Sequence, residues 1–180
     1  MNSELEALTD WTVNHVRINE TKSKAMIIGY SKLMTRRDFD FDNRPYIKIN
    51  DKNLNYSDFV TNLGLIIDKT LDWTTQINTT CNKVFAGIHS LKKVSDFIPL
   101  HVKVMLVESS IFSYFSYGDI VINDMTVALS ERLQRTQNYC IRFFFNLRRD
   151  DHITPLFQQL HVPKLKQMRI YHILMLLHDL

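Results

Sequence analysis

The chain has 180 residues, of which 45% are hydrophobic and 23% are charged, and it carries a net charge of +3. The apolar share is large enough for a packed interior and excludes wholesale disorder, whereas so small a charge does not by itself identify a nucleic-acid binder. Two cysteines exclude a disulfide framework and favour an intracellular setting, with nucleus and cytoplasm left undistinguished. Because the N-terminus is acidic and no apolar run approaches the roughly 20 residues of a membrane span, we expect a protein that is neither secreted nor membrane-bound.

Residues 1–72 are expected to form a small mixed region with antiparallel β-structure. Residues 1–16 show the helical spacing of apolar side chains, and Asp51-Lys52-Asn53 is typical of a hairpin turn. Residues 35–44 are charged and turn-rich, which predicts an exposed loop. The apolar or alternating patterns of strands occur in four segments: 25–30, 45–50, 54–59 and 59–67.

Helical periodicity begins at Asp72, whose carboxylate is suited to capping the N-terminus of a helix. The apolar residues that follow recur at steps of three and four: Trp73, Ile77, Cys81, Val84, Ile88 and Leu91. The sequence predicts further helices at 100–115, 128–147, 156–160 and 163–180. The predicted fold class is therefore α+β, with a small antiparallel β part followed by a mainly α-helical bundle.

Common catalytic fingerprints are absent from the sequence. The four glycines, at 29, 64, 87 and 118, are too far apart to form a phosphate-binding glycine-rich loop. Asp38, Asp40 and Asp42 would share one face of an extended strand and could bind a divalent cation. Neighbouring arginines neutralise this run, so a solvated loop is the favoured interpretation and no metal site is predicted.

Cationic side chains recur along one side of the predicted helix at 128–147. Arg132, Arg135, Tyr139 and Arg142 lie at positions i, i+3, i+7 and i+10. Such arginines could contact a phosphate backbone while the tyrosine stacks on a base or sugar. The alternative, which the pattern alone favours, is a solvated helix surface balanced by nearby acidic residues. These residues are Glu131, Asp150 and Asp151.

Five segments, read in order, are similar to segments of the reverse transcriptases of non-LTR retrotransposons of the jockey type. The first two resemble that family's W…N…LNxxKTxxM and LGxxxDxxLxWxxHI stretches, with Gln76 in place of the usual histidine. The family's tryptophan shortly after the third segment has no counterpart in this chain. The five segments are Trp11 to Met26, Val60 to Ile77, Tyr117-Gly118, Gln137-Asn138 with Arg142, and Thr154 to Leu160.

This resemblance implies a partial polymerase. Residues 1–72 would be the end of the palm with a primer-grip-like hairpin, and residues 73–180 the helical thumb and C-terminal extension. The family performs RNA-directed DNA synthesis with Mg²⁺ ions held by aspartates, including those of a Tyr-x-Asp-Asp turn. Asp150-Asp151 is the one adjacent pair of aspartates here, and it does not match that turn. We therefore expect no cofactor in this chain and no catalysis by the chain alone.

The resemblance also implies roles for individual residues. Lys22 matches a palm lysine near the incoming nucleotide, where an ammonium could protonate the leaving pyrophosphate; the alternative is a solvated lysine in a turn. Leu63 and Gly64 would form the tight turn that presents backbone to the primer terminus. Lys83 would face the duplex backbone from the first thumb helix, in addition to Arg132, Arg135, Tyr139 and Arg142.

The partners that the resemblance implies are a primer–template duplex of RNA and DNA, the RNA of the element, or the missing part of the polymerase. Two alternatives stay open, namely a helical protein-interaction module and a transposon relic without function. A basic groove would favour the polymerase fragment, whereas a large uncharged apolar patch would favour association with protein.

Overall fold

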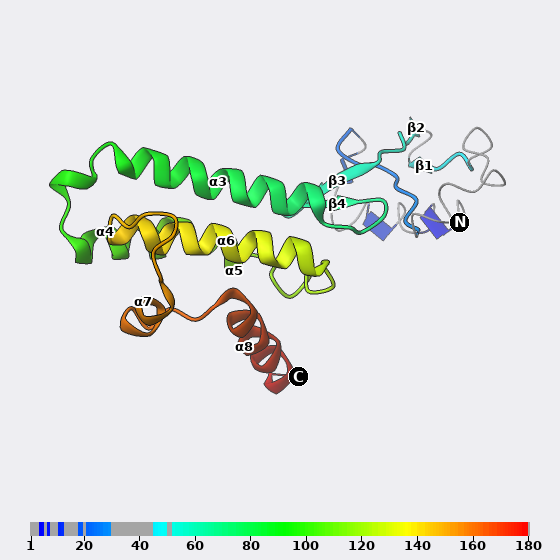
Figure 1. Cartoon of the computed structure of the whole chain (residues 1–180). Helices are drawn as coiled ribbons and strands as arrows, with labels where there is room; N and C mark the ends of the chain where they lie inside the picture. Colours follow the sequence, from blue (N-terminus) through cyan, green and yellow to red (C-terminus); the bar gives the residue numbers. More distant parts are fainter. Residues whose placement is uncertain are drawn as a thin grey trace. The chain divides into compact units, whose positions relative to one another are not determined.

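The computed structural model describes residues 4–5, 7, 11–12, 18–19, 21–29, 45–49 and 52–179. The chain divides into two compact units, Met1–Leu71 and Asp72–Leu180. Antiparallel hairpins in the first unit and helices in the second confirm the predicted α+β class (Figure 1). Within the predicted helix at 1–16 the residues that are described are helical, whereas the predicted loop at 35–44 lies outside the described residues.

The first unit contains two short hairpins. Strand β1 (Lys48–Ile49) pairs with β2 (Lys52–Asn53) in antiparallel fashion, which confirms the predicted hairpin near residues 51–53. The second strand begins at Lys52, earlier than the sequence predicts, because Lys52 pairs with Ile49. Strand β3 (Phe59–Asn62) pairs with β4 (Leu65–Asp68), also antiparallel.

The apolar run at 25–30 does not form the predicted strand over its described residues. Ala25 makes an isolated bridge with Tyr56, and the amide of Gly29 donates to the carbonyl of Lys69 at 3.0 Å. The three residues between these points are half-buried or exposed, not buried as expected. The run is therefore held at two points without joining a sheet.

The segment 59–67, predicted as one strand, is a hairpin that turns at Leu63 and Gly64. The pairing of Asn62 with Leu65 leaves these two residues as the loop. Both have positive φ angles, 47° and 87°, as a type I′ turn requires. Glycine adopts this conformation freely, whereas a leucine in it costs roughly 1–2 kcal/mol. The side chain of Leu63 is 84% exposed at the tip of the hairpin.

The second unit is built from α-helices joined by short connections. They are α3 (Thr74–Lys92), α4 (Leu100–Val107), α5 (Ser113–Ser116), α6 (Val127–Phe144), α7 (Thr154–Gln159) and α8 (Leu165–His178). A 3₁₀ turn, η1 (Ser95–Phe97), follows α3, and a π-helical turn, η2 (Glu108–Phe112), joins α4 to α5. The predicted helices are confirmed, although the π turn interrupts the one at 100–115. None of the described helices has both the length and the apolarity of a membrane span.

Helices α3 and α6 lie side by side and supply much of the core of the second unit (Figure 1). The stripe predicted on α3 is confirmed, because Ile77, Val84 and Ile88 are completely buried. Burial of one such side chain contributes roughly 1.5–3 kcal/mol. Gly87 lies where α3 approaches η2, and a Cβ atom there would be 3.1 Å from Cδ1 of Ile111. A glycine at this position therefore permits the close packing of the two elements.

The start of α3 is fixed by two adjacent residues. The carboxylate of Asp72 accepts a hydrogen bond from the amide of Thr74 at 2.8 Å, as predicted, but the N-cap position itself is taken by Trp73, with φ 62°. The indole of Trp73 is buried, and its N–H donates to the carboxylate of Asp124 at 2.6 Å. This hydrogen bond joins the connection between α5 and α6 to the beginning of α3.

Candidate nucleic-acid interface

Helix α6 presents arginines on the side opposite its buried face. Thr126 caps the helix, because its hydroxyl accepts a hydrogen bond from the amide of Leu129 at 3.4 Å. Leu133 is buried in the core, whereas Arg132 and Arg135 are exposed. Within the described part of the chain, neither guanidinium forms an ion pair with a carboxylate. Both are therefore available to an anion from solvent.

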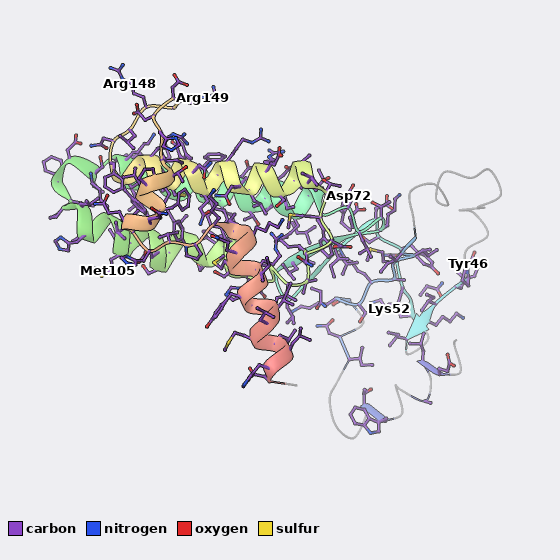
Figure 2. The ribbon with its side chains drawn as sticks, turned by 60° about the horizontal axis from the view of Figure 1, so that its bottom comes forward. Tyr46, Lys52, Asp72, Met105, Arg148 and Arg149 are labelled. Atoms are coloured by element: carbon purple, nitrogen blue, oxygen red, sulfur yellow. The ribbon has the colours of Figure 1, made fainter. Side chains whose placement is uncertain are left out.

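Arg142 holds the loop that follows α6. Its Nε donates to the carbonyl of Arg148 at 3.2 Å, and one Nη donates to the carbonyl of Asp151 at 3.4 Å. The carboxylate of Asp151 accepts the amide of Arg148 at 2.6 Å and so caps the loop. Figure 2 shows Arg148 and Arg149 on the outer side of this loop. Asp151, expected to balance the arginines of the helix, is thus hydrogen-bonded to backbone.

Tyr139 links α6 to α3. The ammonium of Lys92 donates to the Tyr139 hydroxyl at 2.8 Å, and the rings of Phe85 and Tyr139 pack edge to face with centroids 5.2 Å apart. Tyr139 is half-buried, so its ring is fixed by these contacts. The structure therefore adds Lys92 of α3 to the face that carries Arg135 and Arg142.

Lys83 lies on a different side of α3. Its ammonium is 5.7 Å from the ring centroid of Tyr114 on α5, at a cation–π distance. Lys83 and Lys92 are nine residues apart, which places them about half a turn from each other around an α-helix. The structure thus does not bring Lys83 to the arginines of α6, and any contact it makes with a duplex would be separate from theirs.

A cluster of amide side chains on α6 was missed by the sequence analysis. Nε2 of Gln134 donates to Gln137 at 2.8 Å and to Asn138 at 3.0 Å, while Oε1 of Gln134 accepts the amide of Leu165 at 3.1 Å. Nε2 of Gln137, which is 1% exposed, donates to the carbonyl of Pro163 at 2.9 Å. These bonds attach the start of α8 to α6. The sequence did carry a signal for this cluster, namely three amide side chains at positions i, i+3 and i+4 of one predicted helix.

A second missed cluster joins α8 to the connection before α6. Asp119 is buried, and its carboxylate lies 2.7 Å from Nδ1 of His172. Arg169 is buried nearby, with Nε lacking a hydrogen-bond partner in the described structure. Burial lowers the pKa of the Arg169 guanidinium, and the charge of Asp119 partly offsets this effect. Residues 117–119 include the Tyr-Gly pair of the resemblance, so this cluster places that pair beside the C-terminal helix.

Lys22, the candidate general acid, lies in a turn of the first unit. The side-chain oxygen of Asn19 accepts the amides of Thr21 and Lys22 at 3.1 and 3.2 Å. Lys22 itself is exposed. An Asx turn of this kind explains Asn19 but not the lysine, because any residue other than proline could supply the amide at position 22. The alternative of a solvated lysine therefore keeps its place beside the catalytic interpretation.

The acidic residues of the described ranges do not gather into a metal site. No three His, Cys, Asp or Glu side chains in those ranges lie close enough together to hold an ion. The Asp150-Asp151 pair does not fit the role of an Mg²⁺ site, because the carboxylate of Asp151 is bonded to the backbone of its own loop. Comparisons with family models, curated proteins and solved structures found no match to this chain.

Proposed function

We propose that this chain is the end of the palm, the thumb and the C-terminal extension of a non-LTR retrotransposon reverse transcriptase, and that it binds a primer–template duplex. The observation that carries the binding proposal is the exposed pair Arg132 and Arg135 on α6, without carboxylate partners in the described structure. The family proposal is supported by five segments in the order in which the family has them.

The geometry of α6 suits a phosphate backbone. Arg132 and Arg142 are ten residues apart, which corresponds to about 15 Å along the helix axis. One strand of a duplex carries a phosphate for every ~3.4 Å of its axis, so this face spans about four phosphates. Arg132 and Arg135 can each donate two hydrogen bonds to one phosphate, whereas Arg142 has already used two donors within the loop.

The segments that resemble the family also hold the second unit together. Trp73 bonds to Asp124, Gln137 to the Pro163 carbonyl, and Arg142 to the loop before α7. Pro155, from the last segment, lies in the first turn of α7, where its missing N–H costs nothing. A thumb that must keep its shape on a duplex would require these residues, which supports the family proposal.

Catalysis by this chain alone is not part of the proposed function. The sequence has no Tyr-x-Asp-Asp turn, and Asp151 is engaged by backbone. We expect no incorporation of a labelled nucleotide on a primed RNA template with Mg²⁺, compared with denatured protein. Incorporation above that background, lost on replacing Lys22 with Met, would contradict this expectation and restore Lys22 as general acid.

Binding is tested by fluorescence anisotropy with a labelled RNA–DNA duplex of about 20 base pairs at low salt. Replacing both Arg132 and Arg135 with Gln removes two positive charges and is expected to weaken binding at least tenfold, since each contact to phosphate is worth about 1 kcal/mol or more. The control variant, with Lys48 and Lys52 replaced by Gln, loses the same charge from exposed sites on the hairpin of β1 and β2. Equal losses of duplex affinity in the two variants would show that binding depends on net charge alone, and this result would refute the proposed interface.

A second candidate, a protein-interaction module, is favoured by one observation. Helix α8 exposes apolar side chains around much of its second half: Ile170, Tyr171, Leu174, Met175, Leu176 and Leu177. Contiguous apolar surface of this kind is typical of a surface that binds protein or self-associates. A chain that forms oligomers through α8 and fails to bind the duplex would favour this candidate. A chain that neither forms oligomers nor binds the duplex would favour a transposon relic without function.

A further inference from the structure

A cavity of about 820 Å³ lies in the second unit where the ends of α3 and α6 meet η1 and the loop after α6. Its volume is within the range of roughly 300–1,000 Å³ that is usual for small-ligand sites. Its walls combine aromatic rings, amides and positively charged groups. The residues used below are Phe85, Lys92, Arg135, Asn138, Tyr139 and Arg149.

The charge of the cavity is strongly positive. Lys92, Arg135, Arg142 and Arg149 line it, against one carboxylate, that of Asp96. Arg142 is bonded to the loop, and Lys92 donates to Tyr139, but an ammonium has two further N–H groups. Arg135 and Arg149 are exposed, and their guanidinium groups are suited to bidentate contact with a phosphate.

The position of Arg149 is fixed by its neighbours. Arg148 is bonded through its amide to Asp151 and through its carbonyl to Arg142, so the backbone on both sides of Arg149 is held. Arg149 lines the cavity, whereas Arg148 is not among its lining residues. Both arginines are exposed on the same loop (Figure 2). Arg149 therefore belongs to the site, and its neighbour Arg148 does not.

The aromatic wall is suited to a planar ring. Phe85 and Tyr139 pack edge to face at an interplanar angle of 67°, and Phe85 keeps 42% of its surface exposed. A base can stack on such a ring, and this contact tolerates different bases. Asn138 contributes an amide to the same cavity; its oxygen is bonded to Gln134, which leaves the NH₂ group to meet an acceptor on a base edge.

We propose that this cavity binds a single nucleotide unit, with its phosphate against Arg135 and Arg149 and its base on the exposed ring of Phe85, since Lys92 already lies 4.9 Å from the ring centroid of Tyr139. The unit is a free nucleoside monophosphate or the 5′-phosphorylated end of a single strand, which share this chemistry. The proposal goes beyond duplex binding, because Arg132 lies outside the cavity and a duplex does not offer an unstacked base. Binding is reversible and involves no covalent step.

The test is isothermal titration of the whole chain with 5′-AMP, adenosine and inorganic phosphate as separate probes. We expect 5′-AMP to bind more tightly than either of the others, because it alone fills both the cationic and the aromatic parts. Replacing Arg149 with Gln should weaken 5′-AMP binding about tenfold, and the matched Arg148→Gln variant should change it less than about twofold. Phe85→Leu should weaken 5′-AMP but not phosphate.

The outcomes separate this proposal from duplex binding. Equal affinity for 5′-AMP and inorganic phosphate, equal effects of the Arg148 and Arg149 variants, or no detectable binding of 5′-AMP would each overturn it. Loss of 5′-AMP binding in the Arg149→Gln variant with duplex binding intact supports a nucleotide site that shares Arg135, but not Arg149, with the duplex interface. A chain that binds 5′-AMP but no duplex refutes the proposed function alone. A single-stranded oligonucleotide with and without a 5′-phosphate then distinguishes a strand end from a free nucleotide as the occupant.

Discussion

Replacing Gln137 with Met tests whether the amide cluster of α6 holds the C-terminal extension. Met has nearly the same length and shape, so the change removes two hydrogen bonds with little change in packing. The Pro163 carbonyl loses its donor at 2.9 Å, and Gln134 loses one of its acceptors at 2.8 Å. The Gln137 side chain is 1% exposed, whereas Gln134 is half-buried and Pro163 is exposed.

The expected cost follows from the groups left without partners. Each of the two lost hydrogen bonds is part-buried and contributes about 1 kcal/mol, and Gln134 keeps its second acceptor, Asn138. We therefore expect the free energy of unfolding to fall by about 2 kcal/mol, measured by urea titration followed by far-UV circular dichroism. Hydrogen exchange in α8 should accelerate more than in α3, because the lost bonds attach the start of α8 to α6.

Gln159→Met is the matched control. Gln159 is exposed at the end of α7, and its replacement should change the free energy of unfolding by less than about 0.5 kcal/mol. The structural role of the Gln137 amide would be refuted if Gln137→Met lowered the free energy of unfolding by less than about 0.5 kcal/mol. Equal decreases in the two variants would refute it as well. Duplex binding should persist in both variants, because neither change removes a cation of α6.

Three further predictions concern other parts of the chain. Trp73→Phe should cost about 1.5–3 kcal/mol in urea titration, because it removes the hydrogen bond to the Asp124 carboxylate; a loss below about 0.5 kcal/mol would show that the bond is not formed. Leu63→Asn should stabilise the first unit by about 1 kcal/mol, since asparagine tolerates the left-handed turn better, and increased hydrogen exchange in β3 and β4 would contradict this. Burial raises the pKa of the Cys140 thiol from 9.0 to about 12. The unfolded chain therefore loses that proton first, and stability should fall as pH rises through this interval, with a flatter decline in Cys140→Ala.

The helices were predictable because burial on one face imposes a period. Ile77, Val84 and Ile88 fall on the steps of an amphipathic helix, and all three are completely buried. The π turn η2 was not predictable, because the apolar period of 100–115 continues through it without a break. Local periodicity therefore shows which segments are helical, but not where the helical hydrogen bonding changes.

The turn at Leu63 and Gly64 shows a different limit. A two-residue hairpin turn usually contains Asn-Gly or Gly-Gly, and a leucine with positive φ lacks that signal. From the pattern alone, the apolar residues on both sides predict one continuous strand, and only the resemblance implies a tight turn at Leu63 and Gly64. The pairing of β3 with β4 outweighs the conformational cost of the leucine. A local sequence pattern does not show the energy of this pairing.

The candidate site was predictable only as a line of residues on one helix. The spacing of Arg132, Arg135, Tyr139 and Arg142 correctly placed them on one side of α6, but not the attachment of Arg142 to its loop. Lys92 comes from a helix 40 residues or more earlier in the chain, so its contact with Tyr139 depends on tertiary packing. Long-range contacts of this kind leave no periodic signal in a single sequence.

The central claim is that Arg132 and Arg135 contact phosphates of a bound duplex, and the salt dependence of binding tests it most directly. Affinity for the labelled RNA–DNA duplex is measured between about 50 and 200 mM salt, for the wild-type chain and for the variant with both arginines replaced by Gln. Each lost phosphate contact reduces the slope of log affinity against log salt by about 0.9, so we expect a reduction of about 1.8. An unchanged slope would contradict the claim, even if the variant bound more weakly.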